Sequence, residues 1–205
     1  MTHAVPDRSA PIDGRRASRH RNLLAVVDAM LELFAEGNLD PGAQEVADRS
    51  GVSRRSVFRY FEDMEALGRA AIHRMHERLD QFTTPAAAPD APLADRIAAL
   101  AEQRINLYSR GAPAARVMRL RAPFRPLIHD ELERNRIMLD TQVANYFRPE
   151  LDALDAGPRG QIIAVLQVLY SFETFDGLVV RGRDQTEVAA SIIRTATAVL
   201  ASTVG

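Results

Sequence analysis

Residues 44–61 read QEVADRSGVSRRSVFRYF, and this stretch decides the fold of the N-terminal part of the chain. It predicts a short helix over residues 43–50, a turn at Gly51, where glycine tolerates a positive φ, and a second short helix over residues 54–61 that Ser53 caps. Two short helices joined by a tight glycine turn are typical of a helix-turn-helix.

The second of these helices has an apolar face and a polar face. Val57 and Phe61 stand four residues apart and therefore share the inner face, on which Val46 and Ala47 of the first helix would pack. Arginine pairs bidentately with guanine in the major groove, so this pattern predicts a helix that reads base edges. A solvated face of a small helical domain is the alternative for the arginines alone. The residues expected to point outward are Arg54, Arg55, Ser56 and Arg59.

The composition of the 205 residues fits a folded protein, with 46% hydrophobic and 26% charged residues. The chain has no cysteine, which excludes disulfides, thiolate metal sites and cysteine nucleophiles. The net charge is −1 and all 26 basic residues are arginine, so local clusters of arginine, not the total charge, decide where a phosphate backbone would dock. Residues 1–18 lack the apolar centre of a secretory signal, and no apolar run approaches the ~20 residues of a membrane span, so we expect a cytoplasmic protein.

Hydrophobic periodicity predicts an all-α protein of about nine helices, with no strand and no internal repeat. The fifth helix is expected to end at Gly111 and Pro113, and residues 158–180 are expected to form one apolar helix. Asp184 and Glu187 resemble a capping box that opens the last helix. The predicted parts are a flexible basic arm (1–17), a helix-turn-helix domain (18–61), a connecting helix (62–82), a proline-rich linker (83–92), and a ligand-binding and dimerisation domain (93–205).

The segments LLAVVDAMLELFAEG (23–37) and EVADRSGVSRRSVFRYFEDMEAL (45–67) resemble the TetR family of bacterial transcriptional regulators. The resemblance covers about the first third of the chain. It implies that the second helix faces bases, that Gln44 approaches the groove, that Tyr60 lies near a phosphate, and that an arginine arm flanks the DNA. The expected DNA-binding residues are Gln44, Ser53, Arg54, Arg55, Ser56, Phe58, Arg59, Tyr60, Arg15, Arg16 and Arg19.

Three positions depart from the family pattern on the phosphate side of the domain. Gly42 stands where the family often has threonine, Phe58 where it commonly has tyrosine, and Met64 where it usually has lysine. Each departure removes a hydrogen bond or a charge, and the loss of one phosphate contact flattens the salt dependence of binding by up to ~0.9 log unit. We expect the arginine arm to compensate.

In this family the last two helices form a four-helix bundle with a second subunit, so the resemblance implies a homodimer whose recognition helices reach major grooves ~34–36 Å apart on a palindrome. The alternative is that both helices serve only as the core of a monomer. The residues expected at the dimer interface are Ile162, Val165, Leu169, Phe172, Val179, Ile192 and Val199.

Polar residues within the apolar C-terminal helices indicate a small-molecule pocket, because such sites are mostly apolar with a few convergent polar groups. The alternative is that each of these polar residues faces solvent or the dimer interface. The expected polar lining is Tyr108, His129, Asn145, Gln167, Tyr170 and Glu173, and the expected apolar walls are Met118, Phe124 and Met138.

The sequence carries no catalytic motif, and we expect neither an enzyme nor a cofactor. His73 and His76 lie three residues apart, a spacing that can seat a metal, but no carboxylate completes a site, so no metal is expected. We therefore expect a homodimeric repressor that a small molecule releases from a palindromic operator. The alternatives are an activator, a regulator that responds to a protein partner and has no pocket, and a helical ligand-binding protein with a vestigial helix-turn-helix.

Overall fold

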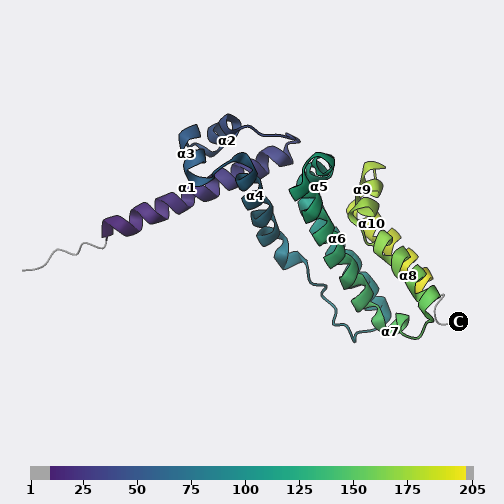
Figure 1. Cartoon of the computed structure of the whole chain (residues 1–205). Coiled ribbons are helices and arrows are strands. Elements are labelled where there is room, and N and C mark those ends of the chain that lie inside the picture. Colours follow the sequence, from purple (N-terminus) through teal and green to yellow (C-terminus); the bar gives the residue numbers. More distant parts are fainter. Residues whose placement is uncertain (1–9, 202–205) are drawn as a thin grey trace, which may run out of the picture. The chain divides into compact units, whose positions relative to one another are not determined.

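The computed structural model describes residues 10–201, and these fold into helices without a strand, as the sequence predicted (Figure 1). Nine of the ten α-helices have seven or more residues, and two short 3-10 turns (η1, η2) follow α4 and α5. The elements are α1 (Ala10–Ala35), α2 (Ala43–Ser50), α3 (Arg54–Tyr60), α4 (Met64–Leu79), η1 (Asp80–Phe82), α5 (Leu93–Arg121), η2 (Ala122–Phe124), α6 (Pro126–Tyr146), α7 (Arg148–Leu151), α8 (Ala156–Leu169), α9 (Phe172–Val180) and α10 (Gln185–Ala201).

The chain divides into two compact units, Met1–Glu77 and Arg78–Gly205. The division falls inside α4, whose last two residues belong to the second unit. Each unit has its own buried core, so we describe the two separately.

Helix α1 begins eight residues earlier than the sequence indicated. We expected a flexible arm over residues 1–17 and a folded domain from residue 18, but the helix starts at Ala10. A proline is tolerated in the first turn because its missing N–H has no partner there in any helix, and Pro11 occupies that place. Residues 1–9 of the predicted arm lie outside the described residues.

The core of the first unit joins α1 to the two short helices. Val46 and Ala47 of α2 and Val57 of α3 are at most 1% exposed, as predicted, and Val26 of α1 is fully buried with them. Phe61, predicted for the same inner face, is half-buried and follows the last residue of α3. Burying an aliphatic side chain of this size stabilises a fold by about 1.5–3 kcal/mol. These contacts hold α3 against the domain and leave its other face to solvent.

Helix α5 forms the centre of the second unit and packs against α6, α9 and α10. It does not end at Gly111 and Pro113 as predicted but runs on to Arg121. Proline removes one backbone hydrogen bond from a helix, but the side chains on both sides of it are buried here, among them Ala112 and Val117, and their packing offsets that loss. A Cβ at Gly111 would lie 3.3 Å from Cδ1 of Leu79, a close contact that the Leu79 side chain would have to relieve by a small shift.

The stretch predicted as one helix over residues 158–180 is two helices, α8 and α9. The chain turns at Tyr170, and the Ser171 side chain then caps α9 by accepting a hydrogen bond from the backbone N–H of Thr174 (3.2 Å). No single helix among residues 10–201 is long and apolar enough to cross a membrane, although α8 and α9 together, bent by 46°, meet that test by length and composition.

The last helix begins as predicted. The Asp184 carboxylate accepts from the backbone N–H of Glu187 (2.9 Å), and the Glu187 carboxylate accepts from the backbone N–H of Asp184 (3.1 Å). This reciprocal pair is the capping box that the sequence indicated.

The segment predicted as a linker is fixed to the second unit by side chains of α5 and α6. Backbone carbonyls that run from the end of η1 to just before α5 each accept a hydrogen bond from one of these side chains. The pairs are Gln103 with Phe82, Gln142 with Thr83, Tyr146 with Ala87 and Arg96 with Ala91, at 2.6–2.9 Å. These hydrogen bonds fix the residues that follow α4 to α5 and α6.

Candidate nucleic-acid interface

The turn between α2 and α3 has the geometry that the sequence predicted. Gly51 adopts φ 71° and ψ 16°, in the left-handed region that side chains disfavour. Ser53 then caps α3, because its hydroxyl accepts a hydrogen bond from the backbone N–H of Ser56 at 3.2 Å. The two serine hydroxyls also lie 3.0 Å apart, so both are engaged at the start of the helix.

The outer face of α3 carries three arginines that form no ion pair among the described residues. Arg54, Arg55 and Arg59 are exposed, and none of them forms an ion pair with an acidic residue in the described part of the chain. Phe58 is 44% exposed on the same helix, and the Arg54 guanidinium lies 5.9 Å from the centre of its ring. Guanidinium groups in this state are available to phosphates and base edges.

Basic groups of α1 and α3 converge on Tyr60. Arg59 donates a hydrogen bond to the Tyr60 hydroxyl (3.2 Å), and its guanidinium lies 5.2 Å from the centre of the ring. This hydrogen bond is the largest effect that lowers the pKa of Tyr60, and the charge of Arg19 contributes to it. The hydroxyl therefore lies in a positive environment that suits a phosphate oxygen.

A fourth arginine close by in the sequence has a structural role. Arg49 forms two 2.8 Å hydrogen bonds to the Glu36 carboxylate and lies 3.5 Å from Glu32, so it connects α2 to α1. The hydrogen bond lowers the pKa of Glu36 and raises that of Arg49. Arg49 is consequently not available to DNA in the way that the arginines of α3 are.

The remaining predicted contacts lie on α1 and at the start of α2. Arg16 and Arg19 are exposed on α1, which makes them part of a helix and not of a flexible arm. The Arg15 side chain lies outside the described residues. Gln44 is exposed, and its amide donates one hydrogen bond to the Asp48 carboxylate at 2.8 Å.

The first unit matches a family model. Residues 26–71, which include α2, α3 and the first half of α4, match the model described as "Bacterial regulatory proteins, tetR family". The N-terminal unit is therefore similar to the corresponding part of TetR-family regulators. The helix-turn-helix and this match support a DNA-binding regulator.

Solved structures share the fold of the whole chain. A transcriptional regulator from Rhodococcus sp. Rha1 is similar with a TM-score of 0.68 at 16% identity, over 90% of this chain and 97% of that one. A TetR-family transcriptional regulator from Streptomyces coelicolor gives a TM-score of 0.68 at 18% identity, over 92% of this chain and 82% of that one. No curated protein matches the sequence.

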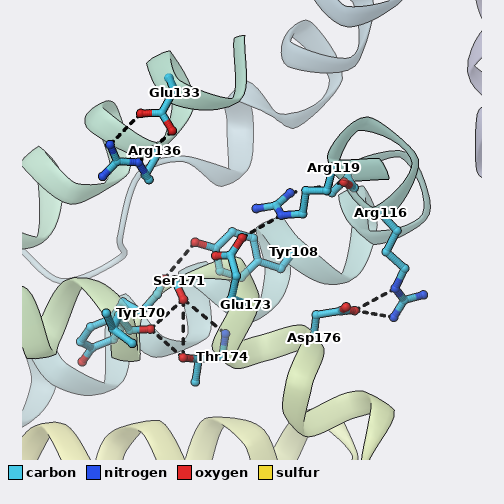
Figure 2. Close-up of polar contacts among 12 residues, drawn as sticks. Tyr108, Arg116, Arg119, Glu133, Arg136, Tyr170, Ser171, Glu173, Thr174 and Asp176 are labelled. Atoms are coloured by element: carbon cyan, nitrogen blue, oxygen red, sulfur yellow. Dashed lines mark hydrogen bonds and ion pairs between the residues drawn. The ribbon is translucent and has the colours of Figure 1, made fainter. Parts of the chain in front are cut away.

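Of the residues predicted to line a pocket in the second unit, Tyr108, Tyr170 and Met118 are buried. The Tyr108 hydroxyl donates to the Tyr170 backbone carbonyl (2.9 Å; Figure 2), and the Tyr170 hydroxyl donates to the carbonyl of Ile97 (3.3 Å). Burial raises the pKa of Tyr108 to about 12 and also raises that of Tyr170. Both hydroxyls therefore join core helices to one another.

Most of the other predicted pocket residues lie on the surface of the second unit, because they occupy helix faces that point away from the core. Glu173 is exposed and accepts a hydrogen bond from Arg119 (2.8 Å; Figure 2). Gln167 is half-buried and donates to the carbonyl of Asp140 (3.4 Å). The remaining predicted residues are exposed, so they do not line an enclosed cavity within one chain. These residues are Phe124, His129, Met138 and Asn145.

The residues predicted for the dimer interface separate into three groups. Phe172 and Ile192 are 5% and 1% exposed and belong to the core of the chain itself, which corrects the prediction for these two. Val165 is 49% exposed on α8. The half-buried members pack on the core with one side, and these are Ile162, Leu169, Val179 and Val199.

Two buried arginines of α5 were not among the predicted site residues. Arg96 is 4% exposed and Arg104 is fully buried. The signal was present, because Arg104 follows Leu100 by four residues and Ile97 by seven, which places it on the apolar face of the helix.

The two histidines considered for a metal lie on α4. His73 is exposed, with Nδ1 3.4 Å from the Glu77 carboxylate. Among residues 10–201, no group of three or more histidine, aspartate or glutamate side chains has the arrangement of a metal site.

Proposed function

We propose that the chain is a homodimeric repressor that acts in the cytoplasm, binds a palindromic operator through α3, and is released by a small-molecule effector. The observation that carries the proposal is the set of three exposed guanidinium groups on α3, none of which has an acidic partner in the described residues. A short helix with this charge, held by the Ser53 cap and the buried Val57, has the form of a major-groove reader.

The exposed face of α8 supports the dimer. Residues 160–172 include no charged side chain, yet Val165 and Val168 of this stretch are 49% and 67% exposed. Exposed apolar side chains next to each other on one helix face are typical of a surface that a partner covers. A second copy that packs on α8 and the adjacent α10 would place two copies of α3 on one palindrome.

The course of α4 supports release by an effector. Its residues 64–77 belong to the DNA-binding unit and its last two to the second unit, so one continuous helix leads from one unit into the other. An effector that favours one arrangement of the second unit acts on DNA binding through this helix. A hundredfold loss of operator affinity requires about 2.7 kcal/mol of coupling.

The test is an affinity measurement on the DNA upstream of the protein's own gene, with fluorescence anisotropy as the readout. The variant R54A/R55A/R59A is expected to lose specific binding and to keep the circular dichroism of the wild type. The control R134A/R148A/R183A removes the same charge from exposed sites of the second unit and is expected to bind as the wild type does. Equal affinities of the two triple variants would overturn the proposal.

Light scattering tests the dimer. The wild type is expected to have twice the mass of the chain, and V165E/V168E, which places charge on the exposed face of α8, is expected to be a monomer with low operator affinity. A wild-type protein that is a monomer at assay concentrations contradicts the homodimer.

A further inference from the structure

The guanidinium of Arg104 lies inside the second unit. The residue is 0% exposed. Its Nη1 donates to the side-chain oxygens of Gln103 and Gln142, each at 2.7 Å, and its Nη2 donates to the carbonyl of Leu139 at 3.0 Å. All three acceptors are neutral. Burial is the main effect on this group and lowers the pKa of the Arg104 guanidinium.

Arg96 on the same helix provides an internal comparison. It is nearly as deeply buried, but it forms an ion pair with Glu150, which itself is only 14% exposed. The fold therefore places a carboxylate next to one buried arginine and none next to the other. The charge of Asp140 raises the pKa of Arg104 without direct contact, because the Asp140 carboxylate forms an ion pair with Arg136 (3.2 Å). A buried charge with only neutral partners is costly unless an anion joins it.

One donor of Arg104 has no acceptor. Its Nε is the buried side-chain nitrogen that has no hydrogen-bond partner among residues 10–201. Buried polar groups in folded proteins nearly always have a partner, so an orphaned donor on an unneutralised cation indicates a missing acceptor. Since the group lacks both an acceptor and a negative charge, a carboxylate supplies what it lacks.

We propose that Arg104 is the anion-binding group of the effector site, and that the effector is an organic monocarboxylate with an apolar body. This inference rests on the proposed function and names the class of its ligand. One buried positive charge balances one negative charge, which favours a monocarboxylate over a multiply charged phosphate. The apolar body is expected because the core around α5 consists of residues such as Leu100, Tyr108, Phe147 and Tyr170.

The hydrogen bonds of Arg104 also connect the site to the end of α4. Gln103 and Gln142 accept from Arg104, and their amide groups donate to the carbonyls of Phe82 and Thr83, immediately after α4 and η1. A carboxylate that accepts from Nε shifts the guanidinium and, with it, the hydrogen bonds from Nη1 to the two glutamine oxygens. The glutamines then turn, and the segment that follows α4 loses its anchors.

The experiment compares carboxylates with their neutral amides on the full-length wild type. Hexanoate and benzoate are titrated by calorimetry against hexanamide and benzamide, with inorganic phosphate as a separate arm. We expect a carboxylate to bind about tenfold or more tightly than its amide, because a charged hydrogen bond is roughly twice as strong as a neutral one. The Nε–H resonance of Arg104, assigned by its absence from R104M, is expected to shift with a carboxylate and not with the amide.

The variants R104M and R104K separate Arg104 from other basic sites, and R194M is the matched control on the surface of α10. R104M is expected to lose the preference for carboxylate, and R194M to keep it. Carboxylate binding that R104M retains, binding of phosphate alone, or no binding by the wild type overturns the inference. If R104M does not fold, R104K, which also lacks this Nε–H, supplies the assignment, and the comparison of carboxylate with amide and the Nε–H shift on the wild type decide the question.

The same samples distinguish this inference from the proposed function. A wild type that binds operator DNA but no carboxylate refutes the ligand class and leaves the DNA-binding function standing. A wild type that binds a carboxylate at Arg104 but no operator supports the site and refutes the repressor.

Discussion

Replacement of Gly51 by alanine tests the turn that orients α3. The residue has φ 71°, and a Cβ at this position meets nothing within 4 Å, so the entire cost of the substitution is conformational. The left-handed region costs a residue with a side chain about 1–2 kcal/mol. We therefore expect Gly51→Ala to lower the free energy of unfolding by that amount. Gly51→Asn is expected to lower it less, because asparagine tolerates this region better.

Gly68→Ala is the matched control. Gly68 lies in α4, a Cβ there also meets nothing within 4 Å, and its φ is not positive. Glycine in a helix costs about 0.8–1.0 kcal/mol relative to alanine, so this variant is expected to be more stable than the wild type. The same chemical change at two open sites of one unit is thus expected to act in opposite directions, with a difference of about 2–3 kcal/mol.

Urea unfolding followed by circular dichroism measures the difference, and anisotropy on operator DNA measures its consequence. Gly51→Ala is expected to weaken operator binding because α3 loses its fixed orientation, whereas Gly68→Ala keeps the affinity. A Gly51→Ala protein as stable as the wild type would show that the backbone at this turn does not have the left-handed geometry, and the argument for the placement of α3 would fail.

Three further perturbations probe both units. The pKa of Tyr108 is about 12 in the folded state against 10.0 in the unfolded state, so the stability that the neutral hydroxyl contributes is full below pH 10 and falls by about 3 kcal/mol as the pH rises toward 12. The chain has no lysine, so no lysine titrates in this range. In urea titrations Y108F is expected to remove part of the fall in stability. R96M is expected to cost about 3–5 kcal/mol because it leaves a buried carboxylate unpaired, and R104M, whose partners are neutral, is expected to cost clearly less by the same measurement; equal losses contradict the contrast. Replacement of Arg16 and Arg19 by alanine is expected to weaken binding equally on specific and random DNA and to flatten the salt dependence by up to ~0.9 log unit for each lost phosphate contact; a loss confined to the operator contradicts this role.

The parts of the fold that short-range patterns govern were predictable from the sequence. The turn at Gly51, the Ser53 cap and the capping box at Asp184 each depend on residues within a few positions of one another, and all three are confirmed. The all-α class follows from periodicity in the same way.

The errors arose where tertiary packing overrides local signals. A proline within a helical pattern usually ends the helix, but α5 continues past Pro113 because the side chains on both sides of it are buried. The bend at Ser171 divides an apolar stretch that reads as one helix. For the candidate sites, periodicity places a residue on the apolar face of a helix, but it does not tell whether another chain, a ligand or the protein's own core covers that face. Phe172 and Ile192 therefore seemed suited to a dimer interface and belong to the core.

The most direct test of the account is arginine-selective modification by phenylglyoxal, mapped by peptide mass spectrometry with and without operator DNA. In the free protein we expect Arg54, Arg55 and Arg59 to react readily because they are exposed, and Arg104 to remain unmodified because it is fully buried. Operator DNA is expected to protect the three arginines of α3 and to leave the exposed Arg183 of the second unit reactive. Undiminished reaction of the α3 arginines in the operator complex would contradict the claim that this helix reads DNA.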